Sequence, residues 1–188
     1  MLQSDRVAFA LRNVDRKYFF SEGMFTNGGR GLLMRGNGKG DLISMPGQDS
    51  GLKIYGEQRG SAVADFNHDG RSDLVVTQNG SHTHLYQNTQ ARPGLRVKVN
   101  VGPANPTGVG AIVRLKFAEG KMGPARLITA GSGYWSQDSA VQVLATPAPP
   151  THVKIRWPNG ETTSTAINQG AKEVAIGSGG DVIPSKLR

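Results

Sequence analysis

The segment DFNHDGRSD, from Asp65 to Asp73, carries oxygen-bearing side chains at the spacing of a cation-binding loop. Counted from Asp65, side-chain oxygens stand at positions 1, 3, 5 and 9, and a main-chain carbonyl is available at position 7. Ca²⁺ accepts about six to eight such oxygen ligands in a flexible shell, whereas Mg²⁺ requires a tight octahedron and retains waters. The pattern therefore predicts a Ca²⁺ site, with the ligands Asp65, Asn67, Asp69, Asp73 and the carbonyl of Arg71.

Two other interpretations of this loop are an EF-hand and a metal-free turn. An EF-hand closes with a bidentate Glu at position 12, and Val76 stands there instead, so the EF-hand is excluded. Asp, Asn and Gly are also ordinary turn residues, and Gly70 permits a backbone conformation that strains other residues. A metal-free, Asx-rich hairpin turn stays open as the alternative.

The flanks of the loop predict the element that carries it. Residues 61–66 are short and apolar, residues 73–78 are rich in β-branched side chains, and Gly80 follows. Both flanks have the composition of strands. The loop is therefore expected to join two strands of a hairpin.

Residues 63–76, VADFNHDGRSDLVV, resemble an FG-GAP/VCBS repeat, and residues 31–43 are similar to the hairpin that closes a preceding blade. The resemblance implies a Ca²⁺-loop blade of an integrin-like β-propeller within residues 31–90. Residues 31–43 lack the usual acidic turn, so no second metal site is expected there.

Three later segments, 108–115, 131–137 and 153–160, are similar in order and spacing to an ASPIC/UnbV domain, which follows such repeats in many bacterial proteins. One departure is residues 141–145, VQVLA, where that family has a segment like His-Phe-Gly-Leu-Gly. The resemblance implies a small β-sandwich-like domain over residues 91–176. The expected fold class is all-β: one or more partial propeller blades with a Ca²⁺-binding hairpin loop, then this domain.

The length of 188 residues bounds the propeller part. A closed propeller needs at least about four blades of roughly 40 residues each, and residues 1–90 can hold about two. We therefore expect the chain to be the C-terminal part of a larger protein that supplies further blades in cis or in trans, with apolar surface exposed along the N-terminal segment. Residues 1–30 have no clear assignment, and residues 177–188 are expected to be a tail.

The net charge of +8 is concentrated in the second half, where residues 91–188 hold 12 Lys and Arg against 5 Asp and Glu. Three segments there, 95–99, 113–117 and 153–157, alternate apolar and basic residues as half-buried strands do. If these strands were neighbours, their cations would form one basic face for an anionic partner such as an acidic polysaccharide; if they lie apart, the cations only solubilise the domain. The cations are Arg96, Lys98, Arg114, Lys116, Lys154 and Arg156.

Nucleic acid is not favoured as that partner, because the sequence has no recognisable helix-turn-helix, zinc-finger, RRM or KH pattern. Tyr134, Trp135 and Gln137 combine flat aromatic faces with a hydrogen-bonding group, as sugar-binding edges do. The alternative is a glycine-bounded turn whose aromatic side chain packs into the domain.

No catalytic constellation is recognisable: a nucleophile elbow and a complete phosphate loop are both lacking, and the chain has no cysteine. No apolar run reaches the length of a membrane span, and an export signal would have to lie upstream of Met1. We therefore expect a non-enzymatic, Ca²⁺-stabilised binding or adhesion module that is extracellular, at the cell surface or periplasmic, with a protein or an anionic polysaccharide as ligand. The alternative is a polysaccharide-acting enzyme, or its substrate-binding appendage, with catalytic residues outside this chain.

Overall fold

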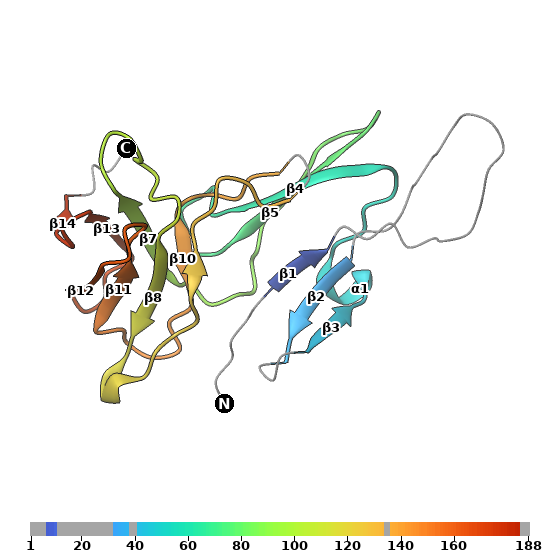
Figure 1. The fold of residues 1–188 in the computed structure, drawn as a ribbon. Helices are drawn as coiled ribbons and strands as arrows, with labels where there is room; N and C mark the ends of the chain where they lie inside the picture. The colour runs from blue at the N-terminus through green and yellow to red at the C-terminus, as the bar shows by residue number, and fades with distance from the viewer. Residues whose placement is uncertain (1–6, 11–31, 38–40, 134–135, 185–188) are drawn as a thin grey trace. The chain divides into compact units, whose positions relative to one another are not determined.

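The computed structural model describes residues 7–10, 32–37, 41–133 and 136–184, and almost all of its regular structure is β (Figure 1). The helices within these residues are a single turn, α1 (Gly47–Ser50), and a 3₁₀ turn, η1 (Ala118–Gly120). The prediction of an all-β chain is confirmed. No helix in the described ranges is long and apolar enough to cross a membrane.

The chain forms two compact units that interleave along the sequence. The first comprises residues 1–62, 74–87 and 133–136, and the second comprises residues 63–73, 88–132 and 137–188. The loop with the predicted metal ligands therefore belongs to the second unit, although the strands on both sides of it run into the first.

The first unit contains a three-stranded antiparallel sheet of β1 (Val7–Ala10), β2 (Leu32–Gly36) and β3 (Leu42–Met45), in that order. β2 and β3 pair antiparallel, with Gly36 opposite Leu42. The Asn-Gly turn expected between these strands falls partly on residues 38–40, which lie outside the described residues.

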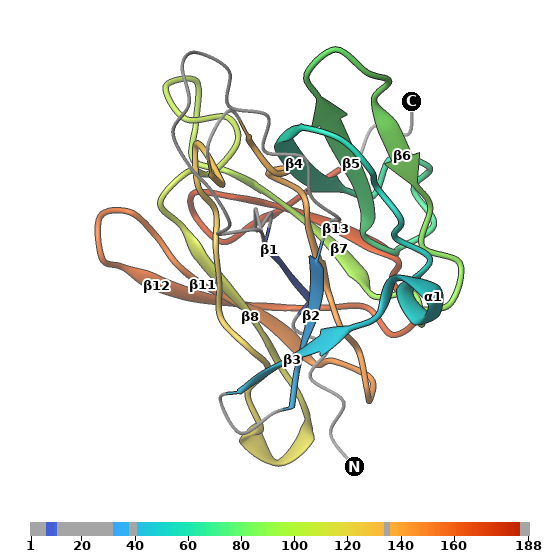
Figure 2. The same ribbon diagram turned by 90° about the vertical axis from the view of Figure 1, so that its right-hand side faces the viewer.

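A second three-stranded sheet has the order β4 (Gln58–Ala64), β5 (Asp73–Gln78), β6 (His84–Tyr86). Figure 2 shows these strands side by side. β5 has the bounds of the predicted strand at 73–78, whereas β4 begins three residues before the predicted strand at 61–66 and ends at Ala64, so Phe66 lies in the loop. The loop thus joins two neighbouring strands, as expected.

The second unit contains two four-stranded sheets. One has the order β10 (Gln142–Leu144), β7 (Leu95–Asn100), β13 (Glu173–Gly177), β14 (Val182–Ile183), with β13 parallel to β7. The other has the order β12 (Thr162–Ala166), β11 (His152–Arg156), β8 (Ile112–Lys116), β9 (Arg126–Leu127). The predicted sandwich-like domain is all-β as expected.

One apolar core is formed by side chains from both of these sheets. β11 contributes the fully buried Val153 and Ile155, which lie opposite Leu115 and Val113 of β8. Trp157 follows β11, is 3 % exposed, and donates its indole N–H to Thr163 Oγ1 at 3.0 Å. Because alternate residues of a strand point to opposite faces, burying this set leaves the basic residues of β11 on the outer face.

Candidate functional site

The predicted metal loop leaves β4 after Ala64 and enters β5 at Asp73. Two residues of the loop have left-handed backbone conformations, His68 with φ 63° and Gly70 with φ 81°. These torsions reverse the chain within a few residues. A Cβ at position 70 would lie 3.0 Å from the carbonyl oxygen of Gly94, so a larger residue there would be crowded as well as strained in its torsion.

The loop closes on the carboxylate of Asp65, whose side chain is only 1 % exposed. The two carboxylate oxygens accept the backbone N–H groups of Asp69, at 3.0 Å, and of Gly70, at 2.9 Å. These hydrogen bonds therefore bring Asp65, Asp69 and Gly70, at positions 1, 5 and 6 of the motif, close together. Burying a carboxylate is costly without such donors, so these hydrogen bonds fix the loop in this conformation.

Asp73, at the other end of the loop, is also buried. Its carboxylate accepts the N–H of Phe66 at 3.2 Å and the N–H of Asn88 at 2.8 Å. Asp73 therefore connects the start of the loop with the segment that follows β6. The sequence predicted a ligand at this position but not these two backbone partners.

Asp69 is the more accessible carboxylate, with a side chain 25 % exposed. It accepts hydrogen bonds from the amide of Asn67, at 3.1 Å, and from the backbone N–H and guanidinium of Arg71, at 2.9 and 3.0 Å. Desolvation acts to raise the pKa of Asp69, but these hydrogen bonds and the charge of Arg71 together lower it. The carboxylate is thus held ionised.

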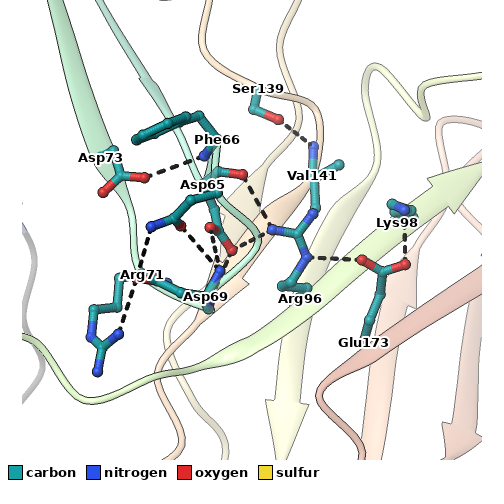
Figure 3. A network of polar contacts seen from close by, with 12 residues as sticks. Asp65, Phe66, Asp69, Arg71, Asp73, Arg96, Lys98, Ser139, Val141 and Glu173 are labelled. Atoms are coloured by element: carbon teal, nitrogen blue, oxygen red, sulfur yellow. Dashed lines mark hydrogen bonds and ion pairs between the residues drawn. The ribbon is translucent and has the colours of Figure 1, made fainter. Parts of the chain in front are cut away.

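Arg96 of β7 is the central cation of the site and is itself buried. Figure 3 shows its guanidinium between two carboxylates: Nη1 forms an ion pair with Asp65, and Nε donates to Glu173 of β13 at 2.8 Å. The other oxygen of Glu173 binds Lys98 at 2.8 Å. Desolvation opposes the charge on Arg96, but the hydrogen bonds and charges of Glu173 and Asp65 raise its pKa, so it stays a cation.

The donor set fits Ca²⁺ in its chemistry, because carboxylate, amide and carbonyl oxygens are the ligands this ion takes. Each carboxylate has about four acceptor sites, and the hydrogen bonds described above leave acceptor capacity on all three aspartates. In the structure, however, guanidinium groups bind two of the carboxylates, and no group of three or more acidic, His or Cys side chains gathers within the described ranges as a metal cluster. An ion would have to compete with Arg71 and Arg96.

The six predicted surface cations divide between the two sheets of the second unit. Arg96 and Lys98 lie on β7 and are engaged by acidic side chains, so they do not contribute to a common basic face. The other four, on β8 and β11, are neighbours, and Lys154 lies directly opposite Arg114. The expectation that both cations of each strand face outward is therefore wrong for Arg96, since a buried carboxylate from a distant loop neutralises it.

Of the predicted sugar-binding edge, Tyr134 and Trp135 lie outside the described residues, and Gln137 is exposed. Two polar neighbours of Gln137 have defined partners. Ser136 Oγ accepts the N–H of Ser61 at 2.9 Å, and Asp138 Oδ1 accepts the N–H of Val63 at 2.8 Å. Both side chains thus satisfy backbone donors of β4, a structural role that no local sequence signal indicated.

Residues 102–181 match the family model ASPIC and UnbV. The match spans β8 to β13 and confirms the resemblance of the C-terminal half to this domain. It does not include residues 31–90, where the FG-GAP/VCBS repeat stays a prediction, as does the predicted division of the chain at residue 91. A search of curated proteins found no match to the chain.

Proposed function

We propose that this chain is a non-enzymatic binding or adhesion module of an exported or cell-surface protein, stabilised by one Ca²⁺ in the loop of residues 65–73. The observation that supports this is the closure of the loop on Asp65. By accepting the N–H groups of Asp69 and Gly70, Asp65 brings the first two acidic residues of the motif together in a tight turn. This carboxylate is buried and stands at the first ligand position of the motif.

The residues that would hold the ion are Asp65, Asn67, Asp69, Asp73 and the carbonyl of Arg71. Ca²⁺ supplies positive charge that the loop otherwise receives from Arg71 and Arg96. Asp65 and Asp73 are buried and held by backbone N–H groups, so they are rigid ligands. Asp69 is partly exposed and hydrogen-bonded only to neighbours within the loop, so it is the ligand that would move.

The loop presents Phe66, which is 51 % exposed, beside these acids. A fixed loop would hold this aromatic side chain in one position for contact with a partner, because the backbone N–H of Phe66 is bound to Asp73. Ordering the loop before binding reduces the entropy that a ligand must overcome. The ion is thus proposed to act on binding through the loop, without direct contact with the ligand.

The first unit supports a place for this chain within a larger propeller. Four of its large apolar side chains are between 47 and 61 % exposed: Leu42, Ile43, Tyr55 and Leu85. Three of them lie on or beside the strands of its two small sheets, where blades of a propeller pack against their neighbours. We infer that further blades, in cis or in trans, cover this apolar surface.

Thermal unfolding in EDTA and in Ca²⁺ tests the proposal. Ca²⁺ should raise the melting temperature of the wild type and of Asp49→Ala, an exposed acid on α1 outside the loop. Asp69→Ala should lose most of that rise in melting temperature, because it removes one of the three carboxylates that would bind the ion. An equal rise in Asp69→Ala and Asp49→Ala would mean that the ion acts elsewhere, and the loop would be only a turn.

A further inference from the structure

The outer face of the sheet β12-β11-β8-β9 carries an unusual arrangement of charge. Inward residues of β11 are buried in the core, so the alternate residues His152, Lys154 and Arg156 occupy the opposite face. The cross-strand register then fixes three rows across this face. They are Ala166-His152-Lys116, Ser164-Lys154-Arg114 and Thr162-Arg156-Ile112.

These rows, which we call the basic face, contain no Asp or Glu. The four cations Arg114, Lys116, Lys154 and Arg156 form no ion pair among the described residues, whereas Arg96 and Lys98 of the other sheet are both paired. The two strands that carry them are hydrogen-bonded neighbours, so the positive charges lie within one compact area.

Lys154 and Arg114 are directly opposite one another, which is destabilising for like charges on neighbouring strands. Nε of Arg114 donates to the carbonyl of Gly123 at 2.9 Å, so this guanidinium is held in place rather than free to turn away. An anionic group placed between the two side chains would relieve their repulsion. The face has no acidic residue of its own, so its charge is complementary to that of an anionic ligand.

The hydroxyl groups of Ser164 and Thr162 stand beside Lys154 and Arg156 in the same rows. Both residues are exposed, so donors and acceptors for neutral polar groups alternate with cations. The rows contain no Phe, Tyr or Trp on which a base could stack, as proteins that bind single-stranded nucleic acid use, and His152 is their only aromatic ring. A polymer with both carboxylate and hydroxyl groups fits this set.

We propose that the basic face binds an acidic polysaccharide, whose carboxylates lie between Lys154 and Arg114 and whose hydroxyl groups contact Ser164 and Thr162. This names the ligand class of the binding function proposed above and rests on that function, but it does not involve the calcium loop. Within the described part of the chain, no residue of the basic face forms a hydrogen bond or an ion pair with Asp65, Asp69 or Asp73.

Calorimetric titration of the full chain with polygalacturonate, in EDTA, tests the proposal. The double variant Lys154→Gln/Arg114→Gln should bind about tenfold more weakly, since each of the two ion pairs that it removes contributes about threefold in affinity. The control Lys53→Gln/Lys172→Gln removes the same charge from exposed positions off this face and should bind like the wild type. Lys154→Gln alone should also melt no lower than the wild type, because it removes the repulsion between the opposed cations and keeps the hydrogen bond from Arg114 to Gly123.

Three outcomes would overturn the inference. Equal losses in the two double variants would mean that net charge alone attracts the polymer. Unchanged affinity in Lys154→Gln/Arg114→Gln would place binding elsewhere. Tighter binding of a single-stranded oligonucleotide than of polygalacturonate would assign the face to nucleic acid. The titration is run without Ca²⁺, so its result does not depend on whether the loop binds Ca²⁺. The melting experiment on Asp69→Ala tests the calcium loop separately.

Discussion

Arg96 and Asp65 form a buried ion pair between residues 31 positions apart, with side chains 6 % and 1 % exposed. A strand of the sandwich thereby holds the first acidic residue of the loop. Glu173, on the strand parallel to β7, binds the same guanidinium, so two sequence-distant segments meet on one arginine. The loop is consequently held by side chains of the second unit, in addition to its covalent connections to β4 and β5.

Replacing Arg96 with Met should destabilise the protein by about 3 kcal/mol, because it leaves the buried carboxylate of Asp65 without its cation. Lys98→Met is the matched control, since Lys98 binds Glu173 from a side chain 40 % exposed and should cost below about 1 kcal/mol. The free energy of unfolding in urea measures both. Adding Asp65→Asn to Arg96→Met should recover part of the loss. Similar values for Arg96→Met and Lys98→Met would contradict the role of the buried pair.

Arg71→Gln should raise the affinity of the loop for Ca²⁺. Its guanidinium binds Asp69 at 3.0 Å and competes with the ion, whereas its backbone carbonyl, the predicted ligand, is retained in the variant. An increase of up to about fivefold is expected for removal of one exposed ion pair. Arg59→Gln, which removes the ion pair with Glu57 outside the loop, should leave the affinity unchanged. A weaker affinity in Arg71→Gln would show that Arg71 supports the ion rather than opposing it.

Gly70→Ala should destabilise the protein more than Gly80→Ala. Both glycines have positive φ, 81° and 67°, which costs other residues about 1–2 kcal/mol. Only at position 70 would the new Cβ also meet backbone, with the Gly94 carbonyl oxygen at 3.0 Å, while nothing lies within 4 Å at position 80. Chemical denaturation compares the two. Equal losses would mean that the loop adjusts to the added methyl group.

Tyr86 gives a test of stability at alkaline pH. Burial raises the pKa of its phenol above the usual 10.0, because the charged form is disfavoured in the fold. The neutral phenol thus stabilises the fold fully below the unfolded pKa, and this contribution is lost as pH rises through the folded value. Tyr86→Phe cannot ionise, so the variant should lose less stability than the wild type above about pH 10. Parallel melting curves across that range would contradict the burial of this group.

The sequence predicted much of the fold because local patterns determine it. Alternation identified the strands of Arg114 and Lys154 and their outward direction, and turn residues marked the hairpin loop at Asp65. The same alternation misplaced Arg96, because its burial depends on carboxylates that lie 31 and 77 residues away. Long-range ion pairs leave no periodic signal in one sequence. The sequence therefore predicted the spacing of the acidic residues in the loop, but it did not predict that Arg71 and Arg96 form ion pairs with them.

The most direct test of the calcium loop is calorimetric titration of the EDTA-stripped protein with Ca²⁺, with Mg²⁺ and the Asp69→Ala variant as controls. The proposal predicts one site per chain with micromolar to millimolar affinity, about the range of sensor and extracellular calcium sites, with Mg²⁺ much weaker and Asp69→Ala without saturable heat. A wild type that shows no saturable heat, together with a melting temperature that Ca²⁺ leaves unchanged, would contradict it. Residues 65–73 would then be a turn that Arg96 and backbone N–H groups stabilise without an ion.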